Sequence, residues 1–229
     1  MQLFFTENTE NEFTISSEES KHITRVLRKK EGDILNFTDG KGNLLVSEIT
    51  SSDTRKTSVK VIDKIEKEKG HNYYLHIAIA PTKNMDRFEW FLEKATEIGI
   101  DEITPLICVN SERKIIKEHR CQKILISAMK QSLKYHLPKL NKPISLTNFL
   151  ETKFDGNKYI AHCQDGKKNT LEEIKKTKKT LFLIGPEGDF SSNEIKIALQ
   201  NQFKAVSLGT SRLRTETAGI IATHTIHNK

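Results

Sequence analysis

Two glycine-containing turns near the end of the sequence have the composition of ligand-binding loops. The first lies in "LFLIGPEGDF" (residues 181–190) and the second in "AVSLGTSRLRTETAG" (residues 205–219). In each, an apolar run stops at a glycine before a segment that predicts the start of a helix. Such turns expose backbone N–H groups, and glycine lets a ligand approach the backbone closely. The chain has neither a GxGxxG motif nor a GK[ST] phosphate loop, so the turns favour an adenosine-type ligand over a nucleoside triphosphate.

Charged side chains accompany both turns. The second turn contains Arg212 and Arg214 and is followed by Glu216, and the first contains Glu187. Arginine presents a planar fork that suits carboxylate or phosphate groups. The two glutamates are candidate general bases, and each can equally cap a helix or pair with an arginine. The three cysteines stand far apart with no histidine at metal-ligand spacing, so we expect neither a metal site nor a disulfide framework.

The segments around these turns predict an α/β domain. From residue 75 onward, apolar runs alternate with amphipathic segments, a pattern typical of a parallel sheet covered by helices on both faces. Ligands of such sheets lie beyond the carboxyl ends of the strands, where both turns fall. The predicted strands are 75–80, 103–109, 159–163, 181–184 and 205–208, and the predicted helices are 86–99, 117–136, 170–176, 191–203 and 215–227.

The first seventy residues predict a separate, smaller domain. Short alternating segments are divided by Gly/Asp turns, as in "GDILNFTDGKGNLLVSEIT", which indicates a small β-barrel. Residues 66–72 are charged and free of apolar side chains, and we place the linker there. We therefore expect one domain at 1–70 and a second at 71–229.

The positive charge is concentrated in the second predicted domain. The formal net charge is +7, of which residues 1–70 carry −1 and residues 71–229 carry +8. A positive face attracts polyanions such as RNA, although a lysine-rich run is also typical of a solvated helix. The candidate phosphate contacts are Arg25, Arg28 and Lys29 in the first domain and Arg113 and Lys114 in the second.

The sequence gives no sign of membrane insertion or export. No apolar run approaches the roughly 18 residues that suggest a membrane span. The N-terminus lacks the basic region of a secretory signal and becomes acidic at once. We therefore expect a cytoplasmic protein that does not associate with membranes.

The two turns resemble the signature pair of a known family. "IGPEGDFSSNE" and "LGTSRLRTETAGIIA" are similar to motifs of the ribosomal RNA uridine-N3 methyltransferases of the SPOUT superfamily, which act on 16S rRNA of the small ribosomal subunit. The resemblance extends over essentially the whole chain. It includes "HITRVLRKKEGDILNFTDGKG", "DRFEWFLEKATEIGIDEITPL" and "AMKQSLKYHLPKL".

This resemblance implies a fold, a cofactor and an activity. The implied fold is an N-terminal PUA-like β-barrel that binds RNA, followed by an α/β-knot domain, the SPOUT trefoil knot, through which two copies form a homodimer. The implied cofactor is S-adenosylmethionine, and the implied activity is methylation of N3 of a specific uridine in 16S rRNA. By motif match, the cofactor site contains Leu183, Gly185, Glu187 and Gly188 from the first turn and Leu208, Gly209, Leu213 and Arg214 from the second.

The chemistry at uridine N3 suggests catalytic roles. N3 carries a proton that must leave, so the site needs either a general base or positive charge that stabilises the uridinate. Arg214 is the candidate for the second role, and Glu187 and Glu216 are the candidates for the first. Two positions depart from the family motifs and leave their roles open. Asp189 stands where glycine is usual, and Arg212 lies one residue after the usual arginine position.

Other functions remain compatible with parts of the sequence. A non-catalytic RNA-binding protein of the same architecture would keep the charge without the cofactor. A related knot methyltransferase would act on a different RNA target, a ribose 2′-hydroxyl or a tRNA guanine, but "LRTETAG" favours uridine N3. An enzyme that uses a nucleotide to act on a small molecule is disfavoured, because no phosphate loop matches.

Overall fold

The chain forms two compact units of unequal size. The computed structural model describes residues 2–174 and 177–229. One unit comprises residues up to 70 together with 129–137, and the other comprises 71–128 and 138–229. The predicted division at residue 70 placed 129–137 in the second domain, because composition does not reveal that a segment far along the chain packs with the first unit.

A five-stranded sheet forms most of the first unit. Its strand order is β1-β3-β4-β5-β2, antiparallel except where β1 lies beside β3. Register shifts between β4 and β5 bend the sheet. The core is built around the rings of Phe4, Phe13 and Phe37. The strands are β1 (Leu3–Phe5), β2 (Glu12–Thr14), β3 (Ile34–Thr38), β4 (Asn43–Ser51) and β5 (Ser58–Glu66).

Two short helical elements and a distant segment complete the first unit. The helix α1 (Ser17–Lys21) continues into a π-helical turn, η1 (His22–Val26). Residues 129–137 bond to the turn between β3 and β4, where the N–H of Gly42 donates to the carbonyl of Tyr135 over 2.8 Å.

A parallel sheet forms the centre of the second unit. Its strand order is β12-β10-β11-β6-β7-β8, and β9 also pairs with β7. All of these pairs are parallel, which confirms the predicted sheet type. The strands are β6 (Tyr74–Ile79), β7 (Glu102–Ile107), β8 (Lys139–Leu140), β9 (Ile144–Ser145), β10 (Asn157–Ala161), β11 (Lys179–Ile184) and β12 (Lys204–Val206).

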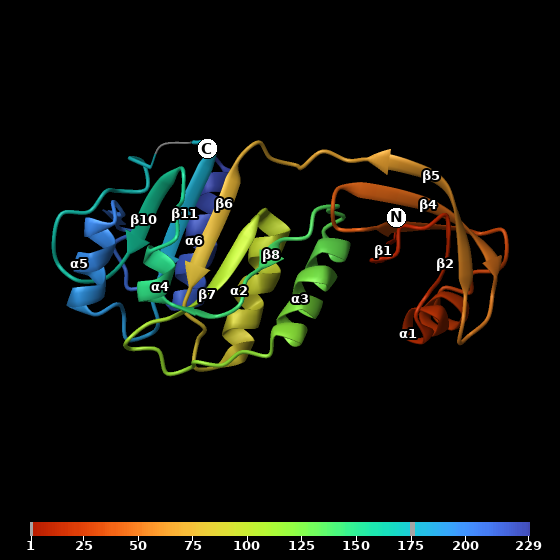
Figure 1. Ribbon diagram of the computed structural model, residues 1–229, viewed down its shortest axis with the longest axis horizontal. Helices are drawn as coiled ribbons and strands as arrows, with labels where there is room; N and C mark the ends of the chain where they lie inside the picture. The colour runs from red at the N-terminus through yellow and green to blue at the C-terminus, as the bar shows by residue number, and fades with distance from the viewer. Residues whose placement is uncertain (1, 175–176) are drawn as a thin grey trace. The chain divides into compact units, whose positions relative to one another are not determined.

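Helices cover both faces of this sheet, as predicted. α4 and α5 lie on one face, and α2 and α6 pack together on the other (Figure 1). Gly219 permits the close approach of α6 to α2, because a Cβ atom there would lie 2.6 Å from the ring of Phe91. The helices are α2 (Met85–Ile98), α3 (Glu118–Gln131), α4 (Leu146–Leu150), α5 (Ser192–Gln200) and α6 (Thr215–His227).

Two predicted helices differ from the structure. The helix predicted over 117–136 ends at Gln131, because Leu133 adopts a left-handed backbone with a φ of 53°. In place of the helix predicted over 170–176, the described residues form a hydrogen-bonded turn at 171–173, and residues 175–176 lie outside the described residues. Within the described ranges, no helix combines the length and apolar character needed to cross a membrane.

Candidate functional site

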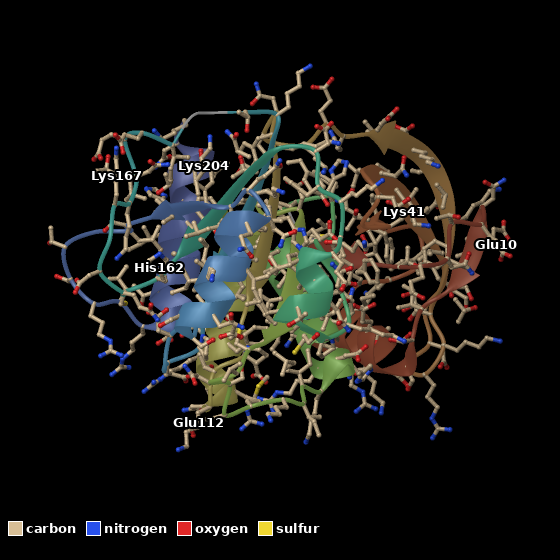
Figure 2. All side chains as sticks on the ribbon, turned by 60° about the vertical axis from the view of Figure 1, so that its left-hand side comes forward. Glu10, Lys41, Glu112, His162, Lys167 and Lys204 are labelled. Carbon is tan, nitrogen blue, oxygen red and sulfur yellow. The ribbon has the colours of Figure 1, made fainter. Side chains whose placement is uncertain are left out.

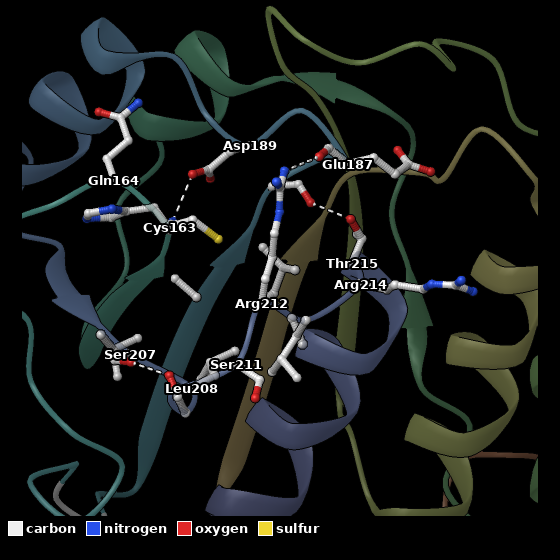
Figure 3. A pocket seen from close by; sticks show the side chains of 18 of the residues that line it. Cys163, Gln164, Glu187, Asp189, Ser207, Leu208, Ser211, Arg212, Arg214 and Thr215 are labelled. Carbon is white, nitrogen blue, oxygen red and sulfur yellow. Dashed lines mark hydrogen bonds between the residues drawn. The ribbon is translucent and has the colours of Figure 1, made fainter.

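A pocket of about 880 Å³ lies beyond the carboxyl ends of β10, β11 and β12 (Figure 3). This is the edge of a parallel sheet at which ligands usually bind, and the volume falls within the range of small-molecule sites. The lining comes from Arg87 on α2, residues 161–164 at the end of β10, Lys168, residues 184–187 and Asp189 at the end of β11, and residues 206–215 and Ala218, which run from the end of β12 into α6.

The two turns singled out in the sequence face each other across this pocket. The hydroxyl of Thr215 donates a 3.0 Å hydrogen bond to the carbonyl of Gly185, and this contact is buried. The guanidinium of Arg212 makes a longer contact of 3.4 Å with the carbonyl of Glu187 (Figure 3). The chain segments after β11 and after β12 therefore form a single site.

The glycines of the turns serve two different needs. A Cβ atom at Gly185 would lie 3.0 Å from the ring of Phe190, so a side chain there would press on that ring. Gly209 has a φ of 142°, which L side chains rarely adopt, and a Cβ there would meet no atom within 4 Å. The backbone at Gly209 therefore borders open space, as a loop that contacts a ligand must.

Six of the eight residues assigned to the cofactor by motif match line the pocket. They are Gly185, Glu187, Leu208, Gly209, Leu213 and Arg214. Leu183 does not, since side chains alternate along a strand: Ile184 faces the pocket and Leu183 is buried in the core under α4 and α5. Gly188 also does not line the pocket. It faces the loop that follows β7, where Nδ2 of Asn110 donates a 3.2 Å hydrogen bond to the carbonyl of Gly188.

The three catalytic candidates occupy different environments. Arg214 is exposed at the N-terminus of α6 and points away from Ser207 and Leu208 (Figure 3). The carboxylate of Glu187 accepts a 2.9 Å hydrogen bond from the backbone N–H of Lys83.

Glu216 does not line the pocket. It is 7% exposed, and its Oε1 atom lies 3.9 Å from Nε of Arg87. Its other oxygen, Oε2, is buried and has no hydrogen-bond partner among the described residues. Glu216 is therefore placed to orient Arg87, whereas direct contact with a ligand in the pocket would require it to move.

Several residues that line the pocket were not predicted from the sequence. They include Arg87, His162, Cys163, Gln164 and Lys168. The strand predicted over 159–163 included His162 and Cys163, whereas β10 ends at Ala161, so "HCQ" follows the strand in the same way as the two glycine turns. Burial and the charge of Lys168 lower the pKa of His162, which favours its neutral form. Arg87 carried no signal, since a single arginine at the start of a helix is common.

The cations predicted to contact RNA differ in their exposure to solvent and in whether they already bind other groups of the protein. Arg25, Arg28 and Lys114 are exposed, while Lys29 lies 3.8 Å from Asp33. The guanidinium of Arg113 instead donates to backbone carbonyls of residues 82 and 83, at 2.7 Å for the shortest of these bonds. Arg113 therefore braces a loop of the protein. Other cations stand on the surface of the second unit, Lys167 and Lys204 among them (Figure 2).

Comparison with known proteins agrees with this geometry. The RNA methyltransferase domain family matches residues 69–227, and the RNA methyltransferase PUA domain family matches residues 15–62. Together with the strand order, these matches confirm the predicted fold class, a PUA-like β-barrel followed by an α/β-knot domain of the SPOUT type.

Individual relatives support the same assignment. A "probable rRNA-methyltransferase" from Porphyromonas gingivalis is 39% identical, with a TM-score of 0.95 over 100% of this chain and 98% of that one. A protein from Legionella pneumophila solved with bound SAM is 28% identical, with a TM-score of 0.89 over 99% of this chain and 96% of that one.

A third relative carries a specific name. The ribosomal RNA small subunit methyltransferase E of Mesomycoplasma hyopneumoniae (strain 232) is 31% identical over 227 residues, which cover 96% of this chain and 95% of that protein. On the strength of this similarity, the two domain matches and the shared fold, the chain belongs to the RNA methyltransferases, within the family of ribosomal RNA small subunit methyltransferase E.

Proposed function

We propose that this protein methylates N3 of a specific uridine in 16S rRNA of the small ribosomal subunit, with S-adenosylmethionine as the methyl donor. The observation that carries the proposal is the pocket formed by the two signature turns, joined by the hydrogen bond from Thr215 to Gly185. The named relatives and the SAM-bound structure support the same reading.

The residues of the pocket fit S-adenosylmethionine. The volume of about 880 Å³ accommodates a nucleoside with its side chain, and the backbone at Gly209 is open toward the cavity. We assign the cofactor to Gly185, Glu187, Leu208, Gly209, Leu213 and Arg214. When bound, S-adenosylmethionine supplies an electrophilic methyl carbon.

The charges around the pocket favour stabilisation of the uridinate over removal of its proton by a glutamate. Arg87, Arg212 and Arg214 all line the cavity. By contrast, Glu187 already accepts a backbone N–H, and Glu216 is buried beside Arg87. We therefore propose that Arg214 and Arg87 stabilise the negative charge that develops on the uracil ring, which lowers the barrier to loss of the N3 proton to solvent water before N3 attacks the methyl carbon. Glu187 remains the alternative as a base.

RNA binding is assigned to cations of both units. We propose that the exposed Arg25, Arg28 and Lys114 contact phosphate groups of the rRNA, and that the half-buried Lys29, 3.8 Å from Asp33, does so as well. Arg113 is removed from this set because its guanidinium is engaged by backbone carbonyls. We further propose that two copies form a homodimer through the knot domain and that the enzyme works in the cytoplasm, where its rRNA substrate is made.

Mass spectrometry of 16S rRNA nucleosides tests this function. Cells with and without the gene are compared, and a plasmid copy of the gene serves as the control. We expect 3-methyluridine to disappear from 16S rRNA on deletion and to return with the plasmid. Unchanged 3-methyluridine in the deletion strain would refute the proposal, and loss of a different methylated nucleoside would indicate another RNA target.

A further inference from the structure

Asp189 binds two backbone N–H groups from different segments of the chain. Its Oδ1 atom accepts a 2.8 Å hydrogen bond from the N–H of Phe190, and its Oδ2 atom accepts a 2.8 Å hydrogen bond from the N–H of Cys163. Cys163 follows β10 and Asp189 follows β11, and both residues line the pocket (Figure 3). The carboxylate therefore links two walls of the same cavity.

This link begins where the sheet ends. The register of β10 and β11 runs to the pair Ala161 and Ile184. Beyond that pair, the segments that follow β10 and β11 are connected by hydrogen bonds from side chains. Besides the bond from Cys163 to Asp189, the amide of Gln164 donates to the carbonyl of Phe190 over 3.0 Å.

The backbone of Asp189 is unusual for a residue with a side chain. Its φ is 62°, in the left-handed region that glycine adopts without strain. Aspartate tolerates this region better than most residues, and here its two carboxylate oxygens are both used. Glycine would suit the backbone equally well and would make neither side-chain bond, so the carboxylate has a role beyond forming the turn.

We infer that Asp189 is a positioning residue for the cofactor, which holds the wall at residues 162–164 against the pocket and so sets the affinity for S-adenosylmethionine. The inference rests on the proposed function, because it takes the pocket as the cofactor site. Asp189 acts through the backbone of Cys163 and needs no contact with the reacting atoms. Loss of the link leaves the two signature turns joined by Thr215 and Gly185, so it weakens binding without removing the site.

The test compares the variants Asp189→Asn and Asp189→Gly with the unaltered chain. Asparagine tolerates the same backbone but presents an NH₂ group in place of one acceptor oxygen, so it breaks one of the two bonds. Asp165→Asn is the matched control, since Asp165 is exposed in the same loop and lies outside the pocket lining. Three quantities are measured on the purified full chain: the Kd for S-adenosylmethionine, the melting temperature, and the rate of amide hydrogen exchange at Cys163.

We expect Asp189→Gly to raise the Kd about tenfold, in line with the loss of a charge-assisted hydrogen bond. Exchange at Cys163 should accelerate at least as much, with little change in melting temperature because glycine suits the turn. Asp189→Asn should fall between this variant and the control. Unaltered Kd or unaltered exchange in Asp189→Gly would overturn the inference, as would a fall in melting temperature large enough to account for the weaker binding. Failure of the proposed function is seen separately, as absence of 3-methyluridine formation by the unaltered chain.

Discussion

The hydroxyl of Thr215 lies 3.0 Å from the carbonyl oxygen of Gly185, in a buried hydrogen bond between the first residue of α6 and the first residue after β11. This bond fixes the spacing of the two turns that line the pocket. Valine matches threonine in shape but cannot donate, and the substitution would leave a buried carbonyl without its partner.

Thr215→Val should therefore weaken binding of S-adenosylmethionine. A loss of about 1–2 kcal/mol, or roughly a 5- to 30-fold rise in Kd, is expected by isothermal titration calorimetry. Thr223→Val is the matched control, because Thr223 is buried in the same helix and its hydroxyl donates within that helix, to the carbonyl of Gly219. Equal effects of the two substitutions on Kd would show that the contact with Gly185 has no special role.

Substitutions of Arg214 and Glu187 distinguish the two routes for loss of the N3 proton. Arg214→Ala should lower kcat by about 10²–10³, the usual cost of losing a group that stabilises transition-state charge, and should change RNA affinity far less. Glu187→Gln keeps an oxygen that can accept the N–H of Lys83, so we expect less than about a tenfold loss of kcat.

The reverse pattern would assign the base to Glu187, since removal of a general base typically costs about 10²–10⁴ in rate. If Arg214→Ala lowered turnover and RNA affinity equally, Arg214 would only contact an RNA phosphate and would have no catalytic role. Both variants are assayed with small ribosomal subunits from cells that lack the gene, so that the target uridine is unmethylated.

Gly219→Ala should destabilise the second unit. The added methyl group would lie 2.6 Å from the ring of Phe91, where α6 packs on α2. Overpacking of this kind typically costs about 1–3 kcal/mol, measured as a fall in the free energy of unfolding in denaturant. The control is Gly70→Ala, because a Cβ atom at Gly70 meets nothing within 4 Å. If the two variants were equally stable, the packing of α6 against α2 would be looser than described.

His76 should make stability depend on pH. The side chain is 6% exposed and its Nε2 atom lies 2.7 Å from Oγ1 of Thr104. Burial lowers the pKa of His76 from 6.5 to about 4, against an opposing effect of Glu102. Between pH 6.5 and pH 4, His76 binds a proton in the unfolded chain but stays neutral in the folded chain. The free energy of unfolding must therefore fall as the pH drops from 6.5 to 4.

The His76→Gln variant isolates this contribution. Glutamine does not titrate, so the variant should lose less stability than the unaltered chain over the same interval, by on the order of 3 kcal/mol. Denaturant unfolding at several pH values measures both slopes, and the comparison holds even if the variant is less stable throughout. Parallel slopes would show that His76 does not resist protonation in the folded protein.

Local sequence signals predicted much of the second unit. The bounds of α6 agree with the prediction of 215–227, and α5 begins at Ser192, one residue after the predicted start. The position of the pocket also followed from the sequence, since both glycine turns come directly after apolar strands. These features depend on contacts between residues close together in the chain, which is why the pattern of residue types reveals them.

Features that depend on distant contacts were not predictable in the same way. One such feature is the assignment of residues 129–137, the segment in which the backbone of Leu133 ends α3, to the first unit. Arg113 is a cation that follows a predicted strand, which suggested an RNA contact. Its guanidinium instead donates to the carbonyl of Lys83, thirty residues earlier in the chain. The inward direction of Leu183 depends on the strand register, because a shift of one residue exchanges the two faces.

The most direct test of the account is the transfer of a labelled methyl group by the purified chain. The protein is incubated with S-adenosylmethionine labelled in its methyl group and with small ribosomal subunits from cells that lack the gene. The account predicts that the label appears in 3-methyluridine of 16S rRNA and that Arg214→Ala nearly abolishes its transfer. Label in any other nucleoside, or no transfer by a chain that binds the cofactor, would contradict it.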